Sequence, residues 1–160
     1  MEFLGGAGVS VDGQKLSMPN LVSYKGMMYA EVPNFIQTFG YINASWTLRA
    51  DLTSEYACRL LNAMDKKGVK QCMPRIQKED LDMSLEDWVQ DFSAGYMRRT
   101  MHLMPKQGNR DPWRNTQDYM FDKKLIREAP LEDGSLLFEE IKPDITVFAV
   151  PTDSDLESAA

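Results

Sequence analysis

Asn43, Ser45 and Thr47 stand where a strand-like segment runs into the start of a predicted helix. Asn and Ser often cap helix N-termini, because their side chains accept hydrogen bonds from backbone amides of the first turn. The other amides of that turn, together with the positive end of the helix dipole, stabilise a negatively charged or electron-rich ligand. The spacing therefore predicts a ligand-facing helix start at residues 43–47.

Two other features could do chemistry, but each has a simpler structural explanation. Gly5, Gly6 and Gly8 form a glycine-rich stretch, yet the dinucleotide fingerprint needs a buried strand before it and a helix after it, and neither is predicted here. We therefore expect a flexible turn rather than a phosphate loop. His102 is the only histidine and has no nucleophile or second ligand at helical spacing. The sequence thus predicts neither a catalytic triad nor a metal site.

Arg114 follows Trp113 on a predicted loop, which places a guanidinium beside an aromatic ring. Such a guanidinium can pair with an internal carboxylate as a structural staple, or it can bind a phosphate. Of these two interpretations we favour the staple.

The composition describes an acidic globular protein. The 160 residues are 43% hydrophobic and 26% charged, with a formal net charge of −6, which suits one domain or part of one. The acidity and the lack of clustered Lys and Arg argue against a nucleic-acid partner. Cys58 and Cys72 have no C-x-x-C spacing, so we expect no disulfide framework, no zinc site and a reducing cytoplasmic location. No apolar stretch suggests a signal peptide or membrane association.

Local patterns predict the elements that would position the helix start. Alternating apolar residues predict short strands around the turn Asp12-Gly13, over 21–29 and over 35–41. A long helix is expected from about 45 to 67, because apolar residues recur at helical spacing and Gly68 follows as a stop signal. Farther along the chain we expect a polar connection at 69–85 and short helical pieces over 88–101, broken by Gly95. A loop is expected at 106–115 and a helix near 119–126. The turn Asp133-Gly134 is then expected to lead into a strand at 136–138.

A series of short motifs occurs between residue 3 and about residue 138: Tyr24–Met28, Val32–Asn34, Phe39–Tyr41, Asn43–Thr47, Cys58–Asn62, Met64-Asp65, Gly95-Tyr96, Pro105–Gly108, Pro112–Arg114, Tyr119 and Leu125–Arg127. Together they closely resemble the C-terminal part of class B flavoprotein monooxygenases, of the ethionamide-activating Baeyer–Villiger type. Because the motifs extend over most of the chain, chance is a poor explanation for the resemblance.

The resemblance implies an FAD- and NADPH-dependent monooxygenase. In that family NADPH reduces the flavin, oxygen forms a C4a-peroxyflavin, and the peroxide attacks a ketone, sulfide or amine substrate. It also implies that the helix after the last strand of the FAD domain points its N-terminus at the pyrimidine edge of the isoalloxazine. The implied cofactor contacts are the amides of Trp46 and Thr47 with the side chain of Asn43 or Ser45. Trp46 as a core anchor is the alternative, and no residue is assigned as catalytic.

The chain also departs from that family. It lacks both G-x-G-x-x-G fingerprints, the F-x-G-x-x-x-H signature and the arginine beside the peroxyflavin, all of which would lie upstream of Met1. We therefore expect an α/β protein in the form of an α+β fragment. Residues 1–68 would end a Rossmann-like FAD-binding domain, 69–138 would form a helical extension, and 139–160 would be a disordered tail. Alone, such a fragment is expected to be inactive and poorly soluble. The alternatives are a non-catalytic interaction module or one half of a split flavoenzyme.

Overall fold

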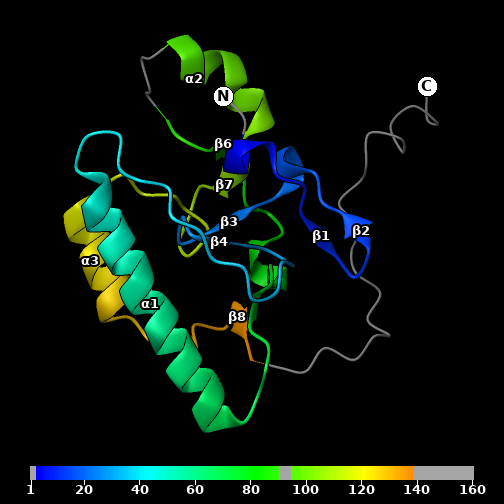
Figure 1. Cartoon of the computed structure of the whole chain (residues 1–160), viewed down its shortest axis with the longest axis vertical. Helices are drawn as coiled ribbons and strands as arrows, with labels where there is room; N and C mark the ends of the chain where they lie inside the picture. The colour runs from blue at the N-terminus through cyan, green and yellow to red at the C-terminus, as the bar shows by residue number, and fades with distance from the viewer. Residues whose placement is uncertain (1–2, 91–94, 139–160) are drawn as a thin grey trace.

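The computed structural model describes residues 3–90 and 95–138, so the tail predicted at 139–160 lies outside the described residues. Figure 1 shows helices α1 and α3 side by side along one edge, with short strands in the middle and α2 at one end. The elements in chain order are η1 (Phe3–Gly6), β1 (Ser10–Val11), β2 (Gln14–Lys15), η2 (Met18–Asn20), β3 (Ser23–Tyr24), β4 (Met28–Tyr29), α1 (Trp46–Lys67), β5 (Met73–Pro74), η3 (Lys78–Asp80), β6 (Leu85–Asp87), α2 (Gly95–Thr100), η4 (Met101–Leu103), β7 (Lys106–Gly108), α3 (Tyr119–Arg127) and β8 (Leu136–Leu137).

The described strands pair as two-stranded antiparallel sheets. β1 pairs with β2, β3 with β4, β5 with β8 and β6 with β7. One isolated parallel bridge joins Val22 to Lys106, so the β3–β4 hairpin and β7 lie next to each other. The described part of the chain is therefore α+β with small sheets. Its place at the end of a Rossmann-like FAD-binding domain stays a prediction.

Helix α1 is 22 residues long, and its sequence marks both of its ends. The Ser45 side chain caps the first turn, and Gly68 ends the last turn in the left-handed conformation with φ 67°, which glycine adopts without a Cβ penalty. Leu52, Tyr56 and Leu60 are buried on one face of the helix, as helical spacing requires. The helix predicted over 45–67 is thereby confirmed.

Helix α3 runs parallel to α1, so the two helices begin at the same end of the molecule. Near the two starts, Arg49 of α1 forms an ion pair with Asp122 of α3. Farther along, the Arg59 guanidinium donates a hydrogen bond at 2.7 Å to the Ala129 carbonyl, just beyond the end of α3. The helix predicted near 119–126 is therefore confirmed, and it supports α1 through these contacts.

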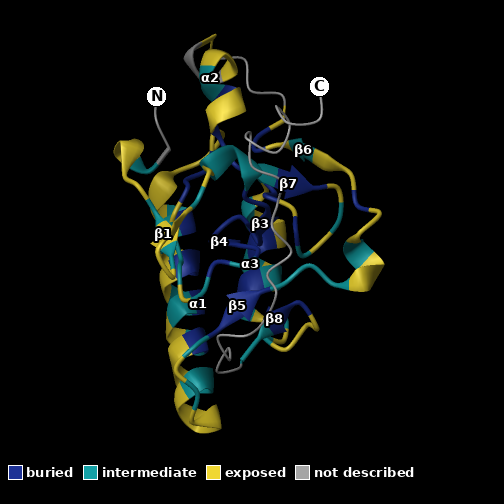
Figure 2. Ribbon diagram, turned by 90° about the vertical axis from the view of Figure 1, so that its right-hand side faces the viewer, coloured by how far each residue is buried: buried dark blue, intermediate teal, exposed yellow. Residues whose placement is uncertain are grey.

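The buried side chains form two clusters. In Figure 2 the buried residues, coloured dark blue, occur on α1 and in the strand segments beside it. Both clusters rely on aromatic and methionine side chains, which bury large apolar surfaces. The first gathers around Tyr24, Met27, Met28, Leu52, Tyr56, Trp113 and Ile126, and the second around Tyr29, Val32, Phe39, Trp88, Met101 and Met104. Because α1, α3 and the β3–β4 hairpin all contribute to the first cluster, it fixes the direction of α1.

The strand predicted over 35–41 is not formed, so that prediction is wrong. The segment is irregular, and one of its amides, that of Gln37, donates to the Met27 carbonyl at 2.8 Å. The side chains of Phe39 and Tyr41 are nevertheless buried. The alternating aromatic residues therefore pack this irregular segment into the core, and they do not indicate a strand with ladder hydrogen bonds.

Other local predictions divide between confirmed and wrong. The Asp12-Gly13 turn forms the β1–β2 hairpin with φ of 50° and 83°, and β8 follows the Asp133-Gly134 turn as predicted. The 69–85 connection, however, contains β5, and the 106–115 loop begins with β7. These strands are too short to show alternation, and their partners lie far away in sequence. Gly95 is the first residue of α2. Because residues 91–94 lie outside the described part, the predicted break of the helical pieces at Gly95 stays a prediction.

Candidate functional site

The start of α1 carries a neutral cap. Ser45 has an extended backbone, and its Oγ accepts the Thr47 amide at 3.3 Å and shares a 2.7 Å hydrogen bond with Thr47 Oγ1. The first turn contains no acidic residue. The positive end of the α1 dipole is therefore not compensated by a carboxylate of its own first turn.

The segment 42–47 that contains this turn is exposed throughout. Exposure extends to two large apolar side chains, because Ile42 is 37% exposed and Trp46 is 55% exposed. The interpretation of Trp46 as a core anchor is therefore wrong. Its indole instead adds an aromatic surface beside the exposed amides of the helix start.

Gly40 determines where the Trp46 indole lies. A Cβ atom at residue 40 would collide with the indole ring, so only glycine permits this close approach. On the same side, the Phe39 ring lies 5.8 Å from the Trp46 ring between centroids. Gly40 and Phe39 thus hold an exposed tryptophan in one place without burying it.

A buried ion pair lies behind the exposed turn. The side chains of Arg49 and Asp122 are each 2% exposed and contact each other directly. The Arg49 guanidinium also donates to the Lys25 carbonyl, and Asp122 accepts a 2.8 Å hydrogen bond from the Tyr41 hydroxyl. Burial raises the pKa of Tyr41 above its usual value, so this phenol keeps its proton. The network ties the starts of α1 and α3 to the turn between β3 and β4.

The loop before α3 holds the same segment from a second side. The Gln117 Oε1 atom accepts the Ile42 amide at 2.9 Å, and the Thr116 hydroxyl donates to Asp122. The Tyr119 ring meets the Tyr41 ring edge to face, with 6.1 Å between centroids. Sequence reasoning missed these supporting residues, because a contact between two distant loops leaves no local signal.

A second ion pair joins Lys25, whose side chain is 1% exposed, to the partly exposed Asp133 at 2.9 Å. The Tyr24 hydroxyl donates to the same carboxylate at 2.7 Å, and the Lys25 ammonium lies 4.8 Å from the centre of the Tyr24 ring and 5.4 Å from that of Tyr56. Burial lowers the pKa of Lys25, and Asp133 opposes that shift. Burial acts to raise the pKa of Asp133, but Lys25 and Tyr24 bring it below its usual value. Because each charge is paired, the cluster serves to join β3 to the turn before β8.

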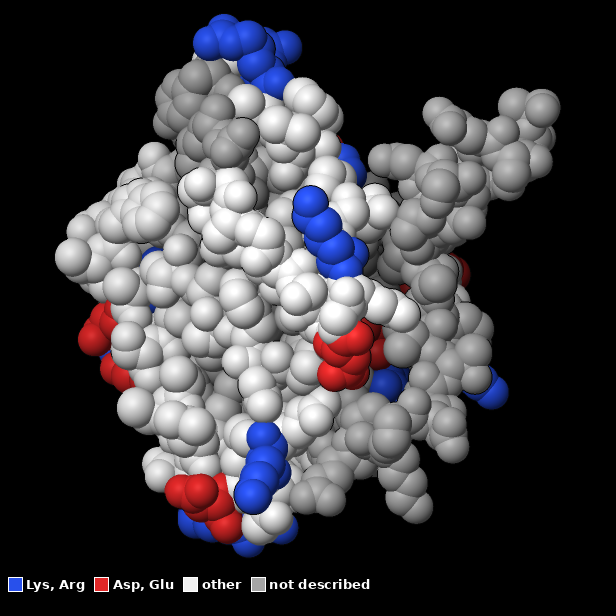
Figure 3. Space-filling view, turned by 45° about the vertical axis from the view of Figure 1, so that its right-hand side comes forward, with Lys and Arg blue, Asp and Glu red and all other residues white. Residues whose placement is uncertain are grey.

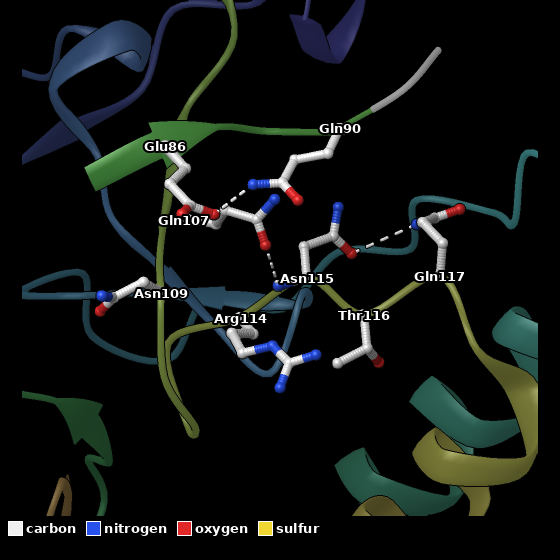
Figure 4. Close-up of a pocket in the computed structure, with 8 residues that line it drawn as sticks. All are labelled: Glu86, Gln90, Gln107, Asn109, Arg114, Asn115, Thr116 and Gln117. Carbon is white, nitrogen blue, oxygen red and sulfur yellow. Dashed lines mark hydrogen bonds between the residues drawn. The ribbon is translucent and has the colours of Figure 1, made fainter. Parts of the chain in front are cut away.

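A polar pocket of about 400 Å³ opens beside the loop that precedes α3 (Figure 4). Its floor consists of three buried residues, Gln107, Asn115 and Thr116. Gln107 donates to the Asp87 carbonyl and accepts the Asn115 amide, so the floor is held by hydrogen bonds at 2.9 and 2.8 Å. The remaining lining residues, nearer the surface, are Glu86, Gln90, Asn109, Arg114 and Gln117.

Arg114 is not an internal staple, so the favoured interpretation of this residue is wrong. Its side chain is 46% exposed, and the nearest carboxylate in the described residues, that of Asp111, lies 4.0 Å away. The guanidinium carbon stands 5.9 Å from the centre of the Phe121 ring. The ring supports the guanidinium but leaves its N–H donors at the mouth of the pocket.

The described residues contain no group of three His, Cys, Asp or Glu side chains placed to hold a metal ion. None of the described helices combines the length and apolarity that crossing a bilayer requires. On the face drawn in Figure 3, basic and acidic side chains occur in small separate groups with uncharged surface between them. No basic stripe gathers on that face.

The structure brings the predicted residues Asn43, Ser45, Trp46 and Thr47 together in one exposed segment. The Ser45 cap was foreseeable from residue type and spacing, and it is confirmed. That the four residues contact a flavin stays a prediction. Ile42 is an addition that sequence reasoning did not single out.

Curated proteins similar to this chain are monooxygenases by name. The chain is 44% identical over 138 residues to "FAD-containing monooxygenase EthA" of Mycolicibacterium smegmatis, covering 86% of this chain and 27% of the relative. It is 40% identical over 141 residues to "Probable FAD-binding monooxygenase AlmA" of Acinetobacter baylyi, covering 88% and 28%. It is 37% identical over 145 residues to "Putative FAD-containing monooxygenase MymA" of Mycobacterium tuberculosis, covering 90% and 29%.

No family model matches the chain, and no solved structure matches it. The sequence likeness nonetheless extends over 86–90% of the chain, an extent similar to that of the motifs noted between residues 3 and 138. The chain is therefore a relative of the FAD-containing monooxygenases, and it spans about 28% of the length of those relatives.

Proposed function

We propose that this chain forms part of an FAD- and NADPH-dependent monooxygenase that acts on small-molecule ketones, sulfides or amines. The observation that carries the proposal is the exposed helix start at 42–47, with a neutral cap and no acidic residue in its first turn, in a relative of FAD-containing monooxygenases. The sequence contains no G-x-G-x-x-G fingerprint. Catalysis would therefore need a nucleotide-binding unit from elsewhere in the polypeptide or from a partner, and the chain alone would be inactive.

The residues present suit the polar edge of a flavin ring. The Trp46 amide belongs to the first residue of α1, and Ser45 holds the Thr47 amide only at a long 3.3 Å, so both can donate to a carbonyl-rich ring edge. The side chain of Asn43 or Ser45 would add a further polar contact. The exposed indole of Trp46 would offer an apolar wall beside the ring. When bound, FAD would supply the redox and oxygen-transfer chemistry.

The helix start would also act on the charge of the ring. Negative charge beside a helix N-terminus is stabilised by about 0.3–1 kcal/mol at an exposed site and by up to about 2 kcal/mol at a partly buried one. The first turn of α1 would thus favour the reduced ring over the oxidised ring. Arg49 and Asp122 would hold the turn in place, and their charges compensate each other.

In this proposal residues 1–68 end the FAD-binding domain and residues 69–138 form its extension. Two ion pairs cross between these ranges, the buried pair of Arg49 with Asp122 and the partly buried pair of Lys25 with Asp133. The extension would therefore support the helix start through the shared core.

The test compares Trp46→Pro with Trp46→Ala in the flavin-loaded protein. Both variants remove the indole, but only proline removes the backbone N–H, and proline is tolerated at the first position of a helix. The extended backbone of Ser45 also suits a following proline. We expect Trp46→Pro to bind FAD about two- to tenfold more weakly than Trp46→Ala, the usual effect of losing one hydrogen bond to an uncharged acceptor.

The measurements are FAD affinity by fluorescence titration and the midpoint potential of the bound flavin. The potential should be lower in Trp46→Pro than in Trp46→Ala, because the lost donor favoured the reduced ring. Equal affinities and equal potentials in the two variants would show that this amide does not face the flavin.

A further inference from the structure

The polar pocket beside the loop before α3 has a floor of buried, hydrogen-bonded side chains. The buried Asn115 side chain donates to the Trp88 carbonyl at 2.9 Å, and the Thr116 hydroxyl donates to Asp122. Gln107 is engaged at both ends of its amide. A ligand would therefore meet a preformed surface, and little ordering of these side chains would accompany binding.

The outer wall offers donors that the protein itself uses only in part. Arg114 has its nearest carboxylate, among the described residues, at the 4.0 Å limit of an ion pair. By contrast Arg110, four residues earlier and 40% exposed, pairs with Asp82 at 2.8 Å and donates to the Glu79 carbonyl. Asn109 and Gln117 bring side-chain amides to the same pocket as Arg114. The Gln117 amide uses one of its two N–H groups to donate to Asn115 Oδ1 at 3.4 Å, so the other remains for a ligand. Two neighbouring arginines thus differ in whether the protein satisfies them.

The opposite wall of the pocket differs in charge. Figure 4 shows Glu86 and Gln90 across the pocket from Arg114, with the Gln90 amide donating to the Glu86 carboxylate. The pocket is therefore polarised, with a cation at one side and an acceptor at the other. A ligand that fits it carries an anionic group at one end and a hydroxyl or amine donor at the other.

Each residue that lines the pocket has a charged, amide or hydroxyl side chain, which does not suit an apolar ketone. The protein as a whole has a net charge of −6, so its general field repels anions and any anion binding must be local. A guanidinium binds planar carboxylates and phosphates through parallel hydrogen bonds. A volume of about 400 Å³ lies within the usual range of small-molecule sites.

We propose that this pocket binds the phosphate or carboxylate group of a small polar molecule, with Arg114 as the anion anchor and Asn109 and Gln117 as flanking donors. This site is separate from the helix start at 42–47 and does not depend on flavin binding. Gln117 reaches both, because its side-chain oxygen holds the Ile42 amide. A ligand in the pocket would therefore lie one side chain away from the proposed flavin contacts.

The experiment is a titration of the isotope-labelled protein, without flavin, with methyl phosphate and, separately, with acetate at constant ionic strength. The side-chain amide signals of Asn109 and Gln117 and the Arg114 Nε signal are followed by NMR. We expect saturable shifts of these signals with at least one of the two probes. The probe that binds more tightly identifies the source of the anionic group.

Two arginine variants make the test specific. We expect Arg114→Gln to weaken probe binding at least tenfold, the usual effect of removing a charge-assisted pair. Arg110→Gln removes the same charge at a neighbouring exposed position and should leave the affinity within twofold. Each variant is first checked for the wild-type amide pattern of the pocket floor. Equal loss in both variants, or no saturable shift with either probe, would overturn the proposal.

Discussion

Helices α1 and α3 begin side by side and run in the same direction, yet their N-termini are completed differently. At α3 the Asp118 carboxylate accepts the amides of Met120 and Phe121 at 2.9 and 3.1 Å. At α1 the neutral Ser45 hydroxyl accepts one amide at 3.3 Å, and the first turn holds no acid. One helix start is therefore closed by a charge of the protein, and the other is left open to a charge from outside.

The two N-termini differ in the charge of their caps and not in their location, because the same buried ion pair holds both of them. Arg49 of α1 and Asp122 of α3 form the buried pair between them, and Tyr41 and Thr116 donate to the same carboxylate. A serine hydroxyl and a carboxylate both supply the capping hydrogen bond at a helix start, but only the carboxylate also compensates the positive end of the helix dipole. The absence of such a carboxylate at α1 is what makes its start a candidate ligand site.

The largest expected effect comes from breaking the shared support. Asp122→Ala leaves the Arg49 charge buried without its partner, so we expect the free energy of unfolding to fall by about 3–5 kcal/mol. Urea unfolding measured by circular dichroism checks this expectation. The matched control is Asp82→Ala, which breaks the exposed pair with Arg110 and should cost no more than about 1 kcal/mol. A loss below about 1 kcal/mol for Asp122→Ala would mean that the two starts do not depend on this pair.

The second prediction gives α1 the same kind of N-cap as α3, an aspartate in place of Ser45. Ser45→Asp places a carboxylate at the open start. We therefore expect the affinity of the protein for FAD to fall about tenfold, a change of about 1.4 kcal/mol in the free energy of binding. The reason is repulsion of the electron-rich ring edge and competition for the first amides. The apoprotein should become more stable by about 0.3–1 kcal/mol.

Ser54→Asp is the control for this prediction, because Ser54 is an exposed serine within the same helix. It adds the same charge away from the first turn and should leave FAD binding nearly unchanged. If both variants bind FAD equally well, the open start of α1 is not the flavin contact, whatever its effect on stability.

Much of the helical framework was predictable because its signals are local. Ser45 and Gly68 bound α1, and apolar spacing marked α3. The β5–β8 pairing was not predictable, because Met73 meets Leu137 only after the whole chain has folded. The strand predicted over 35–41 was wrong although its signal is local. The alternation of aromatic residues is real, but in the structure it packs an irregular segment into the core and does not form a strand.

The same division applies to the candidate sites. The turn at 43–47 was found because capping depends on residues near each other in sequence. The role of Gln117 was not found from the sequence, because its hydrogen bond to the Ile42 amide joins two loops that no local pattern connects. Arg114 looked like a staple, yet whether a guanidinium is buried depends on where Phe121 and Asp111 come to lie.

The smallest expected effect compares the two caps directly through Asp118→Ala and Ser45→Ala. The first removes a charged acceptor of two amides, and we expect it to lower the free energy of unfolding by about 1–2 kcal/mol. The second removes a single long hydrogen bond and should cost about 0.5 kcal/mol. Urea unfolding of both variants in the absence of flavin measures the difference. Equal costs would mean that Ser45 already satisfies its helix as fully as Asp118 does, and an N-terminus that is satisfied from within has little left to offer a ligand.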